Sequence, residues 1–153
     1  MKRGFTLIEI LVVISLIGIL AGLILVSFTG SQKQARDTQR KSDLKQYQNA
    51  LEVFANQSDG LYPSQTTTVA ASALCADLGI SACPEDVRAG DDASFGYRFQ
   101  SDGSGLAVAD AARYVLWAKL ENTADYWVNC SDGRVGTKSQ TGWADPTGGT
   151  CPL

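Results

Sequence analysis

Residues 5–28 read FTLIEILVVISLIGILAGLILVSF, an apolar run of membrane-spanning length that contains one charged residue, Glu9. About 20 apolar residues cross a bilayer as a helix, whereas a charge among them costs about 2.5–3.5 kcal/mol on insertion scales. A side chain this costly in lipid is expected to have a polar partner. We therefore interpret residues 5–28 as a membrane anchor whose acid has a second role.

The helix that begins at Phe5 is predicted to continue to about Ala55, because no proline occurs before Pro63. Residues 31–43 are almost wholly polar, so we expect that section to lie in water. Beyond it, apolar residues recur at helical spacing and are predicted to cover a sheet. These apolar residues are Leu44, Tyr47, Leu51 and Phe54.

Residues 57–153 are predicted to form one small head. The segment 64–94 has no clear pattern and is interpreted as a variable connection. After it, runs of aromatic and β-branched residues predict a small antiparallel meander packed on the helix. The fold class expected is α+β, with a long N-terminal helix on a small antiparallel sheet. The predicted strands lie within residues 95–99, 114–121, 126–130 and 134–137.

Charge and composition exclude several classes of function. The net charge is -3, and residues 57–153 hold six Lys and Arg against twelve Asp and Glu, which argues against nucleic acid as a partner of the head. The chain has no histidine, the commonest general base and metal ligand, and carries no nucleophile-elbow or phosphate-loop motif. We therefore expect a protein that is not an enzyme.

All four cysteines follow the apolar run: Cys75, Cys83, Cys130 and Cys151. If the positive end of the anchor stays in the cytoplasm, the rest of the chain faces an oxidising compartment in which disulfides persist. Four cysteines allow three pairings. We favour the two local pairs, Cys75 with Cys83 and Cys130 with Cys151, the second of which would tie down a Gly-rich tail. A four-cysteine zinc site is the alternative, but the chain has no C-x-x-C pair.

The start of the chain resembles the leader and helix start of type IV prepilins and type II secretion pseudopilins. The residues that carry this resemblance are Lys2-Arg3-Gly4 followed by Phe5-Thr6-Leu7-Ile8-Glu9-Ile10-Leu11-Val12-Val13. The stalk, from Ala35 to Pro63, is more similar to the major pseudopilin branch and to related bacterial pilins. In the head the resemblance is one of architecture.

This resemblance implies a filament subunit that is made as a membrane precursor. A prepilin peptidase would cut between Gly4 and Phe5 and methylate the new amino group, and Glu9 would act in assembly. The expected parts are a leader (1–4), a membrane and filament-core helix (5–28), an amphipathic helix (29–56) and the head (57–153). The expected partners are other copies of the chain, the peptidase, and an inner-membrane platform with its ATPase. The head would lie outside the bacterial inner membrane and later in a periplasmic or surface filament.

The physical chemistry of Glu9 agrees with this expectation. Cutting after Gly4 leaves a cationic amino group on Phe5, one helical turn from Glu9, in a region where an ion pair is barely screened. An added subunit can supply the partner that the acid lacks. The alternative is that Glu9 only sits in the first turn, where the helix dipole favours it.

Three further patterns have competing interpretations. Gly18 and Gly22 form a G-x-x-x-G pattern that permits close helix contact, although glycine is common in membrane helices. Asp132 and Asp145 are the candidates for the calcium site that the resemblance implies, but turn formation explains both, so we expect no metal and no other cofactor. A row of cations either meets acidic heads of neighbouring subunits or is a solvated face. These cations are Lys33, Arg36, Arg40, Lys41 and Lys45.

Two other functions stay open at this point. A generic single-span, membrane-anchored binding module would need neither a cleavage site nor Glu9. A minor pilin with a role in adhesion or DNA uptake would share the leader and the helix. The sequence does not separate a secretion pseudopilus from a surface pilus, because both use the same N-terminal segment.

Overall fold

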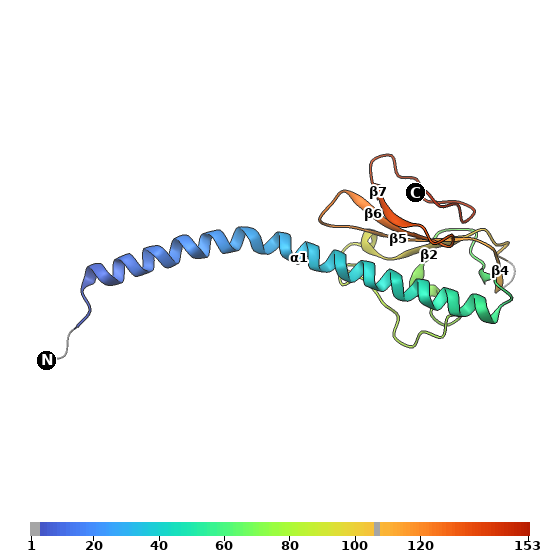
Figure 1. The fold of residues 1–153 in the computed structure, drawn as a ribbon, viewed down its shortest axis with the longest axis horizontal. Helices are drawn as coiled ribbons and strands as arrows, with labels where there is room; N and C mark the ends of the chain where they lie inside the picture. The colour runs from blue at the N-terminus through green and yellow to red at the C-terminus, as the bar shows by residue number, and fades with distance from the viewer. Residues whose placement is uncertain (1–3, 106–107) are drawn as a thin grey trace.

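The structure is a computed structural model that describes residues 4–105 and 108–153. One helix, α1 (Leu7–Gln57), dominates it, with the head packed on the second half while the first half projects away (Figure 1). At 1.5 Å per residue its 51 residues span about 76 Å. The α+β architecture and the continuous helix predicted from the sequence are confirmed.

The head is built on a five-stranded antiparallel sheet in the order β2-β3-β5-β6-β7, with a separate two-stranded sheet, β1-β4. All four predicted strands are present, each with bounds within three residues of those expected. The three shortest strands, β1, β2 and β4, were not predicted. The strands are β1 (Tyr62–Pro63), β2 (Val69–Ala70), β3 (Arg98–Ser101), β4 (Ala109–Ala111), β5 (Tyr114–Lys119), β6 (Asp125–Cys130) and β7 (Val135–Ser139), and the 3-10 helices are η1 (Ala71–Leu74) and η2 (Ala93–Phe95).

The inner face of the sheet packs on the apolar stripe of α1. Leu44, Tyr47 and Leu51 are fully buried there against alternate residues of the strands, such as Phe99 and Leu116. This alternation follows from the two-residue period of a strand. The predicted stripe is correct except at its end, where Ala55 is buried and Phe54 is half-buried.

The outer face of the sheet carries a second, smaller core beneath the C-terminal tail. Val115, Trp117 and Val128 are buried there, and Trp143 and Leu153 of the tail pack against them. The Gly149 N–H donates to the buried Oε1 of Gln100 at 2.8 Å. The tail is therefore a packed layer of the head as well as a chain end tied by a disulfide.

Two disulfides join Cys75 to Cys83 and Cys130 to Cys151, which are the two local pairs, and the structure contains no free cysteine among its described residues. With every thiol oxidised, the alternative of a four-cysteine zinc site does not apply. The first disulfide lies on the helix, since the Tyr47 hydroxyl is 3.3 Å from the Cys83 sulfur. The segment 64–94, interpreted as a variable connection, is ordered around it and contains β2 and η1.

The expectation for residues 31–43 was wrong in part. Asp37, Arg40 and Asp43 are buried against the head, although the section has no apolar stripe. Their burial rests on ion pairs and hydrogen bonds with loops far along the chain, which hydrophobic periodicity does not register. The head thus begins to contact α1 well before Leu44.

Candidate assembly site

The predicted cleavage site lies in an exposed, non-helical stretch directly before α1. Phe5 is 85% exposed, and a Cβ atom placed on Gly4 would meet no other atom within 4 Å. The fold itself therefore does not require glycine at this position. The leader cations Lys2 and Arg3 lie outside the described residues. The peptide bond between Gly4 and Phe5 is sterically accessible in this chain.

Helix α1 begins with a capping box made by Thr6 and Glu9. The Glu9 N–H donates to Thr6 Oγ1 at 3.3 Å, while Glu9 Oε2 accepts from the Thr6 N–H at 2.8 Å and from Thr6 Oγ1 at 2.7 Å. In the described chain, Glu9 Oε1 has no hydrogen-bond donor. Thr6 was not predicted as a site residue, although Thr-x-x-Glu before an apolar run is the pattern of a capping box.

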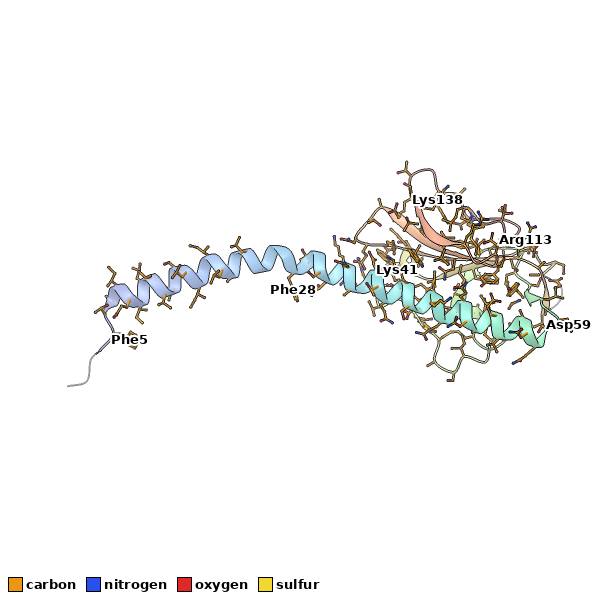
Figure 2. The ribbon with its side chains drawn as sticks, in the orientation of Figure 1. Phe5, Phe28, Lys41, Asp59, Arg113 and Lys138 are labelled. Atoms are coloured by element: carbon orange, nitrogen blue, oxygen red, sulfur yellow. A yellow bond between two sulfur atoms is a disulfide. The ribbon has the colours of Figure 1, made fainter. Side chains whose placement is uncertain are left out.

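The first half of α1 has no protein covering it within the described residues (Figure 2). Every apolar side chain from Leu7 to Leu23 is exposed, and Gly18 and Gly22 have open space where a Cβ would stand. Of the described helices, α1 alone is long and apolar enough to cross a membrane. A shallow hollow surrounds the acid, lined by Phe5, Ile8, Glu9, Val12 and Val13.

A buried ion cluster fastens the head to the middle of α1. Arg40 is fully buried and donates to Asp37 at 2.7 Å, to Glu121 at 2.6 Å and to Asp86 through two nitrogens. Glu121 follows β5, and Asp86 lies in the connection after the Cys75–Cys83 disulfide. The backbone N–H of Glu121 also donates to Asp37, at 2.8 Å. The cluster thus joins three segments that are distant in sequence.

Each charge of the cluster is compensated, which a buried ion requires. Burial alone would lower the pKa of Arg40, but the bonds to Asp86 and Glu121 raise it overall, so the guanidinium stays charged. Hydrogen bonds from Arg36, together with those from Arg40 and Arg88, lower the pKa of Glu121 to about 2, against the effect of burial. The side chain of Phe95 lies beside this cluster, with the guanidinium carbons of Arg40 and Arg88 each 4.6 Å from its ring centre.

The structure corrects one interpretation of the stalk cations. Arg36 donates to Glu121 of its own head at 2.8 Å and 2.6 Å, and Arg40 is buried. Both cations are therefore already paired within the subunit and are not available to a neighbouring head. Lys41 lies over the ring of Trp127, 4.4 Å from its centre. Contact with a neighbouring head stays a prediction for Lys33 and Lys45, which are exposed.

The structure gives Asp132 and Asp145 separate, local partners. Asp132 accepts from the N–H and Nε of Arg134, which closes a turn, and Asp145 accepts from Trp143 Nε1 at 3.0 Å. The one group of three potential ligands in the described chain joins Asp132 to the two sulfurs of the Cys130–Cys151 disulfide, without Asp145. A hard cation needs about six to eight oxygen ligands, which this group does not offer.

The class of this N-terminal segment is defined by three features: the exposed apolar half-helix, its capped acid Glu9, and the accessible peptide bond before the helix. Residues 1–25 match the prokaryotic N-terminal methylation motif. The segment is thus a prepilin-type start followed by a helix of membrane-spanning length.

Three known proteins are similar to part of the chain. The type II secretion system core protein G of Escherichia coli K12 is 42% identical over 53 residues, which are 35% of this chain and 37% of that protein. Its counterpart in Pectobacterium carotovorum is 36% identical over 63 residues, 41% of this chain and 40% of that protein. The type IV major pilin protein PilA of Myxococcus xanthus is 37% identical over 58 residues, 38% of this chain and 26% of that protein.

The alignments thus cover two fifths or less of the length of these curated relatives. No solved structure gives a significant match to the chain. The similarity covers at most 41% of this chain, and the remainder is described by its own structure alone.

Proposed function

We propose that this chain is a structural subunit of a pilin-like filament, of the type II secretion pseudopilus or type IV pilus kind, made as a membrane-anchored precursor. One observation carries the proposal: a prepilin-type motif runs directly into an apolar half-helix that the head leaves uncovered. An exposed apolar surface of this size requires lipid or other helices around it. A bilayer covers it before assembly, and neighbouring copies of α1 cover it afterwards.

The precursor is cut between Gly4 and Phe5 by a prepilin peptidase, which methylates the amino group of Phe5. Two observations support this step: the bond is exposed, and the fold of this chain has no need of a glycine at residue 4. A requirement for glycine there would then come from the peptidase, where only a residue without a side chain lets the backbone approach closely.

Glu9 directs assembly through Oε1, the oxygen that has no donor within the described chain. Thr6 holds Oε2, whereas Oε1 is open to a donor from an incoming copy, such as the cationic amino group of its Phe5. In a water-poor helix bundle an uncompensated carboxylate is costly, so the geometry that supplies the donor is favoured over misaligned ones. Gly18 and Gly22 would let adjacent helices approach closely beside this contact.

The head lies on the outer side of the cytoplasmic membrane, and a membrane platform with its ATPase drives extrusion from the inner side. Two features support this orientation: cations precede the anchor, as the positive-inside rule expects, and both disulfides lie beyond it, where an oxidising compartment would preserve them.

The experiment expresses the full chain with a prepilin peptidase and an assembly platform, then measures the N-terminal mass, membrane fractionation and filament yield. We expect a product that begins at a methylated Phe5 and forms filaments. Glu9→Gln should remain in the membrane and lose filaments. Ser15→Ala is the matched control, because Ser15 is a polar residue of the same half-helix whose hydroxyl donates to the Val12 carbonyl of that helix. This variant should assemble normally.

The alternative, a generic membrane-anchored binding module, predicts an uncut and monomeric product, and Glu9→Gln would then change nothing. Electron microscopy of cells that carry the complete system separates the two kinds of filament. Long surface fibres indicate a pilus, whereas a filament confined to the periplasm indicates a secretion pseudopilus.

A further inference from the structure

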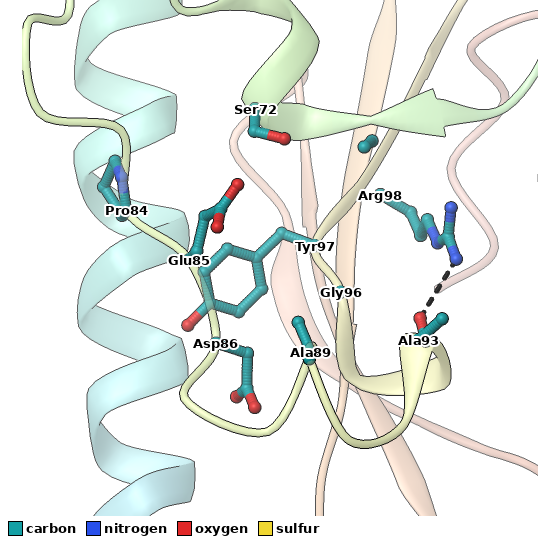
Figure 3. A pocket seen from close by; sticks show the side chains of 11 residues that line it. Ser72, Pro84, Glu85, Asp86, Ala89, Ala93, Gly96, Tyr97 and Arg98 are labelled. Atoms are coloured by element: carbon teal, nitrogen blue, oxygen red, sulfur yellow. Dashed lines mark hydrogen bonds between the residues drawn. The ribbon is translucent and has the colours of Figure 1, made fainter.

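Two half-buried cations on the outer face of the sheet form no ion pair within the described chain, although Lys119 acts on Asp92 at longer range. Arg98, on β3, donates one bond, to the Ala93 carbonyl at 3.1 Å (Figure 3), and Lys119, on β5, donates to Ser94 Oγ at 3.0 Å. Both bonds are to neutral oxygens. The three other arginines of the head are each paired with a carboxylate: Arg88 with Glu121, Arg113 with Asp102, and Arg134 with Asp132.

Strand register brings these cations to one place. Arg98 lies opposite Trp117, Lys119 is two residues beyond Trp117 on the same face of β5, and Tyr126 lies opposite Lys119. All four side chains therefore project on the face that points away from α1. They line a hollow of about 400 Å³ together with Thr68, Ser94, Gly96 and Asp145.

Two nearby carboxylates, those of Glu85 and Asp145, form no ion pair with Arg98. Glu85 lines a second hollow, of about 370 Å³, on the other side of Arg98. Figure 3 shows Glu85 and Arg98 on opposite sides of this second hollow, with Arg98 bonded to the Ala93 carbonyl. Arg98 thus keeps further donors for a ligand. A guanidinium presents a planar fork of donors that matches a carboxylate.

The rest of the lining is hydroxyl-rich. Thr68, Ser94 and Tyr126 contribute hydroxyl groups, and burial raises the pKa of Tyr126, so its hydroxyl keeps its proton at neutral pH. Asp145 is bonded to Trp143 through Oδ1, which leaves its second oxygen as an acceptor. Cations, hydroxyls, one acceptor and an apolar floor are the groups that recognise an acidic sugar.

We propose that this hollow binds an acidic saccharide, whose carboxylate pairs with Arg98 and Lys119 while its ring hydroxyls bond to Asp145 and Tyr126. The volume is within the range of about 300–1,000 Å³ that is usual for small-ligand sites. An extended peptide fits less well, because the neighbouring edge strand, β2, has only two residues to pair with it. This site is independent of the filament role.

The test is a calorimetric titration of the full chain in amine-oxide micelles, which carry neither sugar nor carboxylate. The probes are cellobiouronic acid, the neutral cellobiose, which lacks only the acid, and acetate. We expect the uronic acid to bind at least about tenfold more tightly than either control, and more weakly as salt is raised. Its addition should also shift the NMR signals of the Trp117 indole and the Tyr126 ring.

Arg98→Gln and Lys119→Gln should each weaken binding by about tenfold or more, the loss expected for a bond to a charged group. Neither substitution breaks an ion pair, so both chains should fold, and circular dichroism checks this. Tyr126→Phe removes one hydroxyl and should cost severalfold. Lys45→Gln is the matched control, because Lys45 is an exposed cation on α1 that also bonds a neutral oxygen, Gln48 Oε1, and does not line the hollow, so binding should be unchanged.

Four results with the parent chain would overturn the proposal. They are equal affinity for acetate, which indicates an adventitious ion only; equal affinity for cellobiose; tighter binding of a glutamate-containing peptide; and no binding of the uronic acid at millimolar concentration. An equal loss of binding in the control Lys45→Gln would be a fifth such result, because it would place the ligand elsewhere.

Discussion

The guanidinium of Arg40, in the middle of α1, donates to the carboxylate of Glu121, 81 residues later, at 2.6 Å. Both side chains are almost inaccessible to solvent. This pair is the centre of the cluster that fixes the head to the helix at a defined height. In a filament built through the first half of α1, that attachment would set where the head stands relative to the filament axis.

Replacing Arg40 by Met should destabilise the head by about 3–5 kcal/mol, because three carboxylates would remain with their main cation removed. Urea unfolding of the full chain in micelles, followed by tryptophan fluorescence, measures this change. The exposed Lys138→Met is the control and should stay within about 0.5 kcal/mol of the parent chain. A similarly small change for Arg40→Met would show that the cluster does not hold the head.

Stability should fall in acid through Glu121. Its pKa is lowered from the ordinary 4.5 to about 2 by its arginine partners, so the folded state binds this proton less readily than the unfolded state. The contribution is therefore fully present above pH 4.5 and is lost as the pH falls toward 2. Free energies of unfolding measured across this window should show the decline, and Glu121→Gln should flatten it. An unchanged acid profile in Glu121→Gln would refute this assignment.

The Cys130–Cys151 disulfide should hold the tail over the outer face of the sheet. Replacing both cysteines by serine should cost about 2–5 kcal/mol and expose Trp117, which is 2% exposed in the intact head. Limited proteolysis should then cut within residues 140–153, and tryptophan emission should shift to the red. The Cys75 and Cys83 double substitution is the comparison. The Cys75–Cys83 disulfide closes a shorter loop, so its removal should leave the tail resistant to protease.

Two adjacent glycines of the tail provide a matched pair. Both have positive φ, so alanine at Gly148, where a Cβ meets nothing within 4 Å, should cost about 1–2 kcal/mol from the backbone alone. A Cβ at Gly149 would lie 2.4 Å from the Arg113 carbonyl oxygen, and Gly149→Ala should cost about 1–3 kcal/mol more. Unfolding measurements on the two variants give the difference. Equal costs would mean that the tail is not closely packed there.

Local patterns predicted the long helix, its apolar half and the main strands, because each of these depends on residues near one another in the chain. The stripe from Leu44 to Leu51 illustrates this: its spacing alone identified the side that is buried. The role of residues 31–43 could not be predicted in the same way. Asp37, Arg40 and Asp43 are buried through partners in distant loops, and polar sequence in itself favours exposure.

The same contrast holds for the sites. The roles of Gly4, Phe5 and Glu9 are proposed from sequence, because the motif is contiguous and a charge in an apolar run is costly wherever the run folds. The role of Thr6 could also have been predicted from sequence, because Thr6 and Glu9 have the spacing of a capping box. Arg98 and Lys119 were not, since their proximity and their lack of an ion pair depend on strand register and on where the tail lies.

The sequence by itself therefore determined the prepilin-type start, the anchor with its single acid, and the α+β class, all of which follow from length, periodicity and local charge. Only the tertiary structure decided that Arg36 and Arg40 bind their own head, that the tail forms a second core, and that two cations share a hollow. Such relationships join residues that are far apart in the chain. They follow from burial and pairing across the whole fold, for which no local pattern exists.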